Sequence, residues 1–257
     1  MSTIVMSGCA TGIGAATREL LESAGHQVIG IDIRDAEIIA DLSTAQGRGQ
    51  ALGAVRAQCG ERLDGLVLCA GLGAQTAAVG KVVSVNYFGA LDLLDGLLPL
   101  LQKGQSPSAV VISSVASAQL SWEKNPLAAA LEAGDEAGAR AIVEQAGEHG
   151  GNLAYAATKN ALTVAVRKRS QQWGQSGVRL NTVAPGATET PLLQAGLQDP
   201  RYSESIAKFL PPMGRRAAPA EMASVVAFLL SDAASYVHAS QLYVDGGIDA
   251  VMRPTQF

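Results

Sequence analysis

Short apolar segments alternate with longer amphipathic segments along the whole chain. The apolar segments are rich in β-branched side chains and cover residues 3–7, 27–32, 36–41, 64–70, 109–114, 178–184 and 241–247. The segments with helical character cover residues 12–24, 44–59, 81–102, 152–173 and 219–231. Strands that are apolar on both faces are typical of a parallel sheet covered by helices on both sides. The pattern therefore predicts an α/β, Rossmann-type, doubly wound parallel sheet of seven strands.

The chain length suits one large α/β domain. The sequence has 257 residues and no internal repeat, low-complexity tract or linker that would divide it, so we expect a single domain over residues 1–257. No apolar run is long enough to cross a membrane, and the start "MSTIVMSGCATGIG" lacks the pattern of a signal peptide. We expect no membrane partner and a location in the cytoplasm.

The acidic charge is concentrated in one segment. The formal net charge is −4, and residues 117–151 contain six acidic against two basic side chains, so the remainder is balanced. A nucleic-acid partner would require a basic stripe or an arginine cluster, and the sequence has neither. We therefore expect no nucleic-acid partner.

The cysteines and histidines show no metal-ligand spacing. The chain has three of each and no C-x-x-C pair, which indicates structural roles for all six and no metal site; the residues are Cys9, Cys59, Cys69, His26, His149 and His238.

A glycine-rich turn follows the first predicted strand. In "SGCATGIG", Gly8, Gly12 and Gly14 precede an amphipathic helix, and the intervening Thr11 and Ile13 share the turn. Glycines here let the backbone approach a pyrophosphate at the helix N-terminus. The spacing differs from G-x-G-x-x-G, so a purely structural turn is the alternative.

Asp32 ends the second predicted strand, 24 residues after Gly8. A carboxylate there can accept hydrogen bonds from the adenosine ribose and disfavours the 2′-phosphate of NADP, which predicts NAD as cofactor. Arg34 could serve such a phosphate, but we interpret it as an adenine-side or surface residue. Four residues after the third and fourth strands are placed to border the adenosine half: Asp41, Leu42, Ala70 and Gly71.

Hydroxyl and amine groups follow the fifth strand. Ser113 and Ser114 end that strand, and "YAATK" places Tyr155 and Lys159 one turn apart on a helix. Alone, such a pair is common on solvated helix faces. With a nearby hydroxyl and a nicotinamide it can transfer a proton at a substrate oxygen, because an adjacent cation lowers the pKa of a phenol.

Taken together, "SGCATGIG", "CAG", "VVSVNYFGA", "YAATK" and "NTVAPGATETP" resemble the short-chain dehydrogenase/reductase family from residue 3 to about 247. The resemblance implies a catalytic set of Asn86, Ser114, Tyr155 and Lys159. Tyr155 would be the general acid/base, Ser114 would hold the substrate oxygen, Lys159 would bind the nicotinamide ribose and tune Tyr155, and Asn86 would order a water. Three residues after the sixth strand would position the nicotinamide carboxamide: Pro185, Gly186 and Thr188.

Four departures from the family pattern are visible. Ser7 replaces the usual threonine, "CAG" stands where N-N-A-G is common, and the short path from Gly71 to Asn86 predicts a trimmed helix. Ser114 and Tyr155 lie 41 residues apart because of an acidic insertion, residues 117–151, which the sequence predicts to form two short helices.

The insertion, the trimmed approach to Asn86 and the ending "DGGIDAVMRPTQF" resemble a bacterial subgroup that acts on 3-hydroxy and 3-keto steroids and on other carbonyl compounds. The segment 188–214, here called the lid, offers Leu, Ile, Phe and Met beside the nicotinamide site and independently favours an apolar substrate. The same side chains could instead form local core.

Three other functions use the same residues in part. A 3-oxoacyl carrier-protein reductase would share the site, but Asp32 and the lack of a basic docking patch count against it. A nucleotide-sensing regulator could lose the Ser, Tyr or Lys that this chain keeps. A sugar-nucleotide epimerase would need a larger substrate domain.

The resemblance also bears on assembly. Family members commonly form tetramers in which the helices at 81–102 and 152–173 pair with symmetry mates. The bulk and charge of the insertion should block that contact, so we expect a homodimer through residues 219–231 and 241–244.

Overall fold

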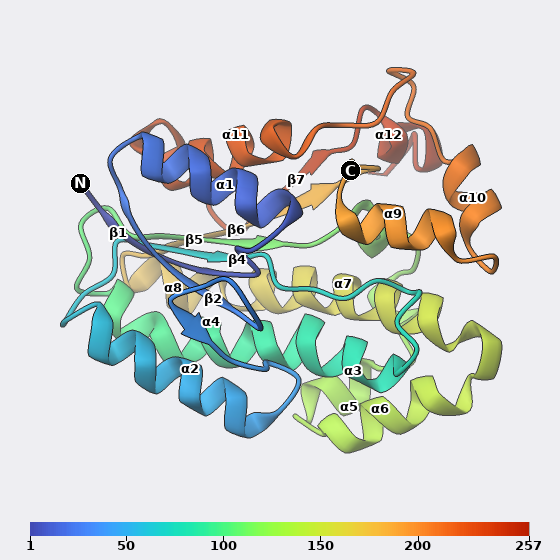
Figure 1. Cartoon of the computed structure of the whole chain (residues 1–257), viewed down its shortest axis with the longest axis horizontal. Coiled ribbons are helices and arrows are strands. Elements are labelled where there is room, and N and C mark those ends of the chain that lie inside the picture. The colour runs from blue at the N-terminus through green and yellow to red at the C-terminus, as the bar shows by residue number, and fades with distance from the viewer. Residues whose placement is uncertain (257) are drawn as a thin grey trace.

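A computed structural model describes residues 1–256 and contains one seven-stranded sheet (Figure 1). Every strand pairing is parallel, and the order is β3-β2-β1-β4-β5-β6-β7. The strand order therefore reverses between β1 and β4, and ligands of open α/β sheets bind beyond the carboxyl ends at such a point. The predicted single-domain, doubly wound sheet is confirmed.

Six strands agree with the prediction to within three residues at either end: β1 (Thr3–Ser7), β2 (Gln27–Asp32), β4 (Gly65–Leu68), β5 (Ser108–Ile112), β6 (Arg179–Pro185) and β7 (Gln241–Val244). The prediction of a strand over 36–41 was wrong in extent, because β3 contains only Ile38–Ile39. Just before β3, the Glu37 carboxylate accepts a hydrogen bond from the N–H of Gly30, on β2, at 2.8 Å. This side chain supplies the acceptor that a longer edge strand would have provided.

Helices cover both faces of the sheet, as Figure 1 shows. On one face α1 (Gly12–Ser23) packs on α11 (Pro219–Leu230). The other face carries α2 (Ala45–Gln58), α4 (Ala90–Leu101) and α7 (Gly150–Lys168). The remaining α-helices are α3 (Val79–Val83), α5 (Ala128–Glu132), α6 (Glu136–Gln145), α8 (Ser170–Gln175), α9 (Pro191–Gln198), α10 (Ser203–Lys208) and α12 (Ile248–Met252).

Two predicted helices are interrupted. The segment 81–102 consists of α3, a π-helical stretch η1 (Ser84–Gly89) and α4. The segment 152–173 divides into α7 and α8, because the N–H of Arg169 bonds to the carbonyls of both Ala165 and Val166 and tightens the last turn. The expected trimming is confirmed: the described chain has no helix between β4 and α3.

The insertion forms α5 and α6, as predicted, with Gly134 at φ +68° between them. It packs on α3 and α7. The guanidinium of Arg48, on α2, is almost fully buried and binds Asp92 at 2.6 Å and Glu136 at 2.7 Å. One buried cation therefore ties α2, α4 and the insertion together.

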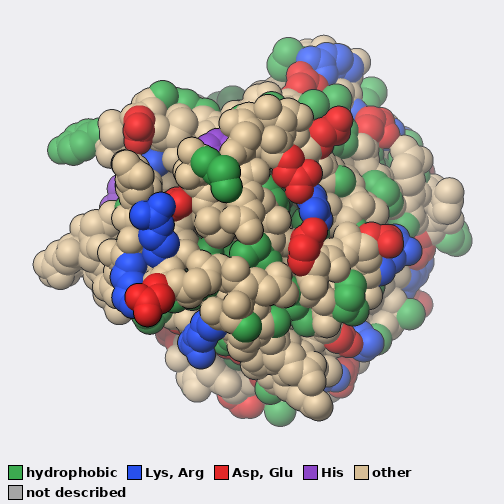
Figure 2. Space-filling view, turned by 60° about the vertical axis from the view of Figure 1, so that its left-hand side comes forward, with side chains coloured by type: hydrophobic (Ala, Val, Ile, Leu, Met, Phe, Trp, Pro, Cys, Tyr) green, Lys and Arg blue, Asp and Glu red, His purple; other side chains and the backbone are tan. Residues whose placement is uncertain are grey.

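One face of the molecule carries side chains of both charges. On the face in Figure 2, basic side chains lie beside acidic ones rather than in a stripe of one sign. Among residues 1–256, no helix combines the length and the apolar character that crossing a bilayer requires.

Candidate active site

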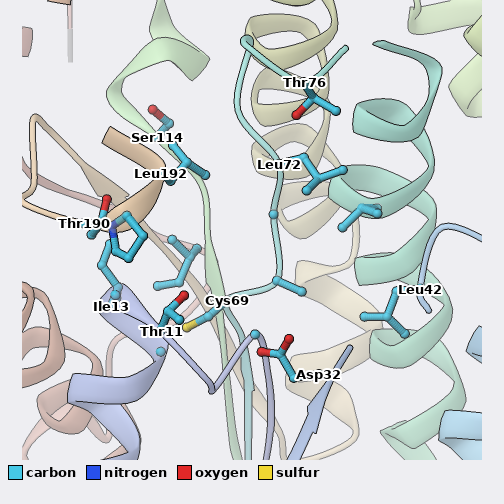
Figure 3. Close-up of a pocket in the computed structure, with 18 of the residues that line it drawn as sticks. Thr11, Ile13, Asp32, Leu42, Cys69, Leu72, Thr76, Ser114, Thr190 and Leu192 are labelled. Atoms are coloured by element: carbon cyan, nitrogen blue, oxygen red, sulfur yellow. The ribbon is translucent and has the colours of Figure 1, made fainter. Parts of the chain in front are cut away.

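The main cavity lies at the carboxyl ends of the strands and has a volume of about 550 Å³. Figure 3 shows Asp32 and Leu42 at one end, Ser114 and Leu192 at the other, and Thr11, Ile13 and Cys69 between them. The cavity is therefore elongated, with an acid at one end and hydroxyl chemistry at the other.

The glycine-rich turn forms the floor of the cavity. Gly8 has φ +68°, and a Cβ there would collide with the backbone of Ala70, so the turn needs glycine to lie against the end of β4. The Ser7 hydroxyl accepts from the N–H of Ala70 at 3.3 Å, so serine retains a hydroxyl contact here. Thr11 is the N-cap of α1 and makes no side-chain cap bond, which leaves the first-turn N–H groups available to a phosphate.

Asp32 stands at the end of β2 and lines the cavity. Its two carboxylate oxygens accept from the N–H groups of Ala10 at 3.0 Å and Ile33 at 2.7 Å, which fixes the side chain beside the glycine-rich turn. Further along the wall, hydrogen bonds from Ser43 hold the pKa of Asp41 below its usual value, and Lys81 contributes to the same direction. This end of the cavity is thus anionic.

The two serines that end β5 have different environments. The Ser113 hydroxyl donates to the Lys159 carbonyl at 3.1 Å and contacts Thr163 at 3.0 Å, so it holds the sheet against α7. The Ser114 hydroxyl accepts from the N–H of Ala116 at 3.1 Å and faces the cavity near Tyr155. Of the two, Ser114 is the one beside the phenol.

Tyr155 and Lys159 line the same part of the cavity from α7. Burial raises the pKa of Tyr155, and the hydrogen bond with Ser114 opposes that rise. Burial also lowers the pKa of Lys159 to about 8. The expectation that Lys159 lowers the pKa of Tyr155 is therefore not met in this structure, because burial dominates and Lys159 Nζ instead donates to the Ile112 carbonyl at 2.7 Å.

Asn86 lies behind the cavity wall, within the π-helical stretch η1, and is fully buried. Its carboxamide forms two hydrogen bonds with the backbone of Leu72, at 2.7 and 3.0 Å. These bonds fix the loop after β4, whose Gly71 lies against both Asn86 Oδ1 and Lys159 Nζ. In this structure the side chain organises the loop without lining the cavity.

The lid borders the chemical end of the cavity through the start of α9, on which α10 packs. Thr190 caps α9 by accepting from the N–H of Leu193 at 3.2 Å, and Leu192 projects into the cavity. The Gln75 side chain donates to the Leu192 carbonyl at 3.2 Å, and Arg201 donates to the Gln75 carbonyl at 3.3 Å. The lid thus contacts the helix-free loop that follows β4.

The structure brings together all the predicted site residues except Asn86 as cavity-lining groups: Gly8, Thr11, Gly12, Ile13, Gly14, Asp32, Asp41, Leu42, Ala70, Gly71, Ser114, Tyr155, Lys159, Pro185, Gly186 and Thr188. Lining residues that were not singled out include Ser43, Cys69, Leu72, Thr76, Lys81 and Val85. Cys69, interpreted as structural, lines the cavity, and burial raises the pKa of its thiol to about 12. The position of Cys69 directly after the fourth strand could have identified it as a cavity-lining residue from the sequence.

The donor set of the cavity fits a nicotinamide dinucleotide. The cradle of glycines, the open helix N-terminus and the carboxylate at the end of β2 match pyrophosphate and ribose. Within residues 1–256, no group of three or more His, Cys, Asp or Glu side chains is arranged to hold a metal ion.

Comparison with known proteins agrees with this geometry. The family profile described as "short chain dehydrogenase" matches residues 2–136, and that described as "Enoyl-(Acyl carrier protein) reductase" matches residues 140–249. A 3-alpha-hydroxysteroid dehydrogenase/carbonyl reductase of Comamonas testosteroni is 76% identical over 257 residues, covering 100% of both chains. A coniferyl-alcohol dehydrogenase of a Pseudomonas species is 32% identical and 95% of each chain is covered.

Solved structures give the same result. The 3-alpha-hydroxysteroid dehydrogenase from Pseudomonas sp. B-0831, complexed with NADH, is 52% identical with a TM-score of 0.97 and full coverage of both chains. Levodione reductase is 27% identical with a TM-score of 0.75, covering 97% of this chain and 98% of that chain.

Proposed function

Since the chain belongs to the short-chain dehydrogenase/reductase family, we propose that it is an NAD-dependent oxidoreductase that interconverts 3-hydroxy and 3-keto steroids and reduces other carbonyl compounds. One observation carries the proposal: a single cavity joins the glycine-rich turn and Asp32 to Ser114, Tyr155 and Lys159. The 76% identity to the Comamonas enzyme supports the steroid and carbonyl substrates.

Residues at both ends of the cavity would hold the cofactor. The N–H groups at the start of α1 would bind the pyrophosphate, Asp32 would bind the adenosine ribose, and four lining residues would border the adenosine: Asp41, Leu42, Ala70 and Gly71. Pro185, Gly186 and Thr188 would position the carboxamide, and Lys159 would bind the second ribose. NAD supplies or accepts the hydride at the substrate carbon.

The proton is handled by Tyr155 Oη. In reduction Tyr155 donates its proton to the carbonyl oxygen, and Ser114 Oγ donates a hydrogen bond to the same oxygen. The raised pKa of Tyr155 keeps its proton at neutral pH, which suits reduction; oxidation needs the phenolate and should accelerate as pH rises. Leu72 and Leu192 offer apolar contact to a hydrophobic substrate.

The proposal is tested by following NADH absorbance with three substrates in parallel. We expect turnover with a 3-ketosteroid and with a simple aromatic ketone, and none with an acyl thioester. The match of residues 140–249 to an acyl-carrier reductase profile makes the third substrate the informative one. Activity confined to the thioester would favour the acyl reductase, and inertness toward all three would favour a nucleotide-sensing regulator.

Asp32 is expected to exclude NADP. Asp32→Ala should weaken NADH binding and narrow the NADH-over-NADPH preference by roughly tenfold or more, since removing the carboxylate removes both the ribose acceptor and the like charge. The measurement is kcat/KM with each cofactor. Asp35→Asn, in the same loop but with an exposed side chain, is the matched control and should leave the preference unchanged. A wild-type enzyme that uses NADPH as well as NADH would refute the assignment.

We also infer a homodimer, and the packing of the insertion supports it. Glu132 of α5 pairs with Lys168 on α7, and the Lys168 ammonium lies 5.2 Å from the centre of the Trp122 ring. The insertion therefore covers part of the helix face that family tetramers use. Its charge matters less than its bulk, because Glu132 and Glu136 are neutralised by Lys168 and Arg48.

The proposed dimer contact lies at the β7 edge of the sheet, where apolar side chains are exposed. Phe228 on α11 is 41% exposed, the Tyr236 side chain is fully exposed, and all four residues of β7 are only half-buried. Such apolar surface at an edge strand supports a self-complementary two-fold contact through α11 and β7.

Light scattering tests this assembly. We expect a dimer for the wild type and a tetramer when residues 119–149 are replaced by a short loop. Phe228→Asp, on the proposed contact, should shift the wild type toward monomer because it buries a charge in the interface. A wild-type tetramer would contradict the inference. The expected cytoplasmic location stays a prediction, consistent with three free cysteines in the described chain.

A further inference from the structure

Two buried asparagines join the insertion to the helix that carries Tyr155 and Lys159. Asn125, which precedes α5, is 5% exposed, and Asn160 of α7 is 7% exposed. Asn125 Nδ2 donates to the carbonyl of Ala157 at 2.9 Å and to Asn160 Oδ1 at 3.0 Å. The insertion is thus fastened to α7 between and beside the two proposed catalytic positions.

The side-chain N–H groups of Asn160 point toward the turn that follows β5. Its Nδ2 donates to the carbonyls of Ser117 at 3.0 Å and Leu120 at 3.1 Å. Both carbonyls belong to the turn that begins at Ser114, which caps the short helix η2 (Val115–Ala118) through its hydroxyl. One carboxamide therefore connects α7, the turn after Ser114 and the insertion.

The chain itself does little to hold Ser114 beside Tyr155. The 40 residues between them make a long closed loop, and loops of this length constrain their ends weakly. The relative position of the two hydroxyls comes from non-covalent contacts: Ser113 bonds the end of β5 to α7, and the buried, well-formed bonds of Asn160 hold the turn after Ser114 on the same helix. Without Asn160, two carbonyls would lose their donor and the turn could move to reach water.

We propose that Asn160 is a positioning residue for the reaction: it holds the turn 114–120 on α7 so that the Ser114 hydroxyl faces Tyr155. Asn125 donates to the carboxamide oxygen of Asn160 and so docks the insertion on α7. The insertion therefore packs on this helix without displacing the turn that holds Ser114. The inference rests on the proposed function, because it assigns Asn160 a part in the chemistry of Ser114 and Tyr155.

Asn160→Ala should lower kcat by roughly 10- to 100-fold, since a displacement of the order of 1 Å in a reacting group costs that much. KM for NADH should change by less than about twofold, because Asn160 itself does not line the cavity. The pH profile of alcohol oxidation should move to higher pH. The Ser114 hydroxyl lowers the pKa of Tyr155, so losing that contact leaves the phenol protonated to a higher pH.

Asn181→Ala is the matched control. Asn181 lies in β6, is fully buried and makes a comparable set of bonds, to the Val237 carbonyl at 2.8 Å and from the Ser240 N–H at 3.1 Å. It should lose stability in thermal melts but keep the wild-type kcat and pH profile. Asn125→Ala leaves both donations of Asn160 in place and should reduce kcat less than Asn160→Ala does.

Wild-type kcat and pH profile in Asn160→Ala would overturn the proposal, as would equal changes in Asn181→Ala. If Asn160→Ala does not fold, Asn160→Ser, which keeps a small polar side chain, is measured against the same criteria. Failure of the proposed function is distinguishable, because it would show as a wild type inert toward carbonyl substrates.

Discussion

Tyr155→Phe is expected to reduce turnover by at least the ~10²- to 10⁴-fold typical of a lost general acid/base. The ring keeps its packing on α7, and only the proton-bearing oxygen is removed. NADH affinity should therefore stay near that of the wild type. Steady-state kcat with a ketone substrate and NADH binding followed by fluorescence measure the two quantities separately.

The control is a second buried tyrosine. Tyr87 is 7% exposed, and burial raises the pKa of its phenol as it does for Tyr155, but Tyr87 lies outside the main cavity. Tyr87→Phe should retain turnover. Near-normal kcat in Tyr155→Phe would refute the mechanism, whatever the control shows.

The sheet was predictable because buried parallel strands have a simple sequence signature. Strands such as Val110 and its neighbours in β5 are apolar on both faces, so they stand out against amphipathic helices. The edge strand β3 was overestimated because its apolar run continues beyond the two residues that pair. The backbone N–H of Gly30 could donate to a strand carbonyl or to the Glu37 carboxylate. Which acceptor it uses depends on tertiary structure, which the periodicity of the sequence does not encode.

Interruptions of helices were missed for a related reason. The π-helical turn at Asn86 and the break at Arg169 change the backbone bonding pattern without a proline or a glycine at those positions. Periodicity over 81–102 and 152–173 is little altered by one widened turn at Asn86 or one tightened turn at Arg169. The consequence matters for the site, because the π-helical turn contains the buried Asn86.

Site residues were predictable where position along a strand determines location. Residues directly after β1, β2, β4, β5 and β6 meet at one edge, so Gly8, Asp32 and Ser114 could be grouped from the sequence. Contacts between the insertion and α7, such as Asn125 with Asn160, depend on how the 40 residues between Ser114 and Tyr155 fold back. The pKa shifts of Tyr155 and Lys159 also depend on burial, which the spacing of "YAATK" does not reveal.

Lys159→Met should lose both NADH affinity and turnover. The ammonium is the proposed contact to the nicotinamide ribose, so removing it should weaken cofactor binding and the placement of the nicotinamide beside Tyr155. We expect kcat/KM to fall by at least roughly 10²-fold, of the same order as other losses of a positioned acid/base partner. Lys168→Met, on the exposed face of the same helix, should leave both quantities unchanged.

The same substitution is expected to stabilise the fold. A pKa lowered from 10.5 to about 8 means that burying the ammonium costs on the order of 3 kcal/mol at neutral pH. Losing the hydrogen bond to the Ile112 carbonyl costs the variant about 1 kcal/mol. Lys159→Met should therefore be more stable than the wild type at pH 7.

The gain in stability of Lys159→Met should shrink as pH rises. This pH dependence tests the lowered pKa of Lys159 independently of activity. Between about pH 8 and 10.5 the folded wild type has a neutral amine while the unfolded chain is still protonated, so the contribution of Lys159 to wild-type stability increases with pH in this window. The variant lacks this contribution, and groups common to both proteins, such as the Cys69 thiol with its raised pKa, cancel in the difference between them. Urea unfolding of both proteins at pH 7 and pH 9.5 measures the difference. A variant that is less stable than the wild type at pH 7 would show that Lys159 is not held at a cost, and the electrostatic account of the site would have to be abandoned.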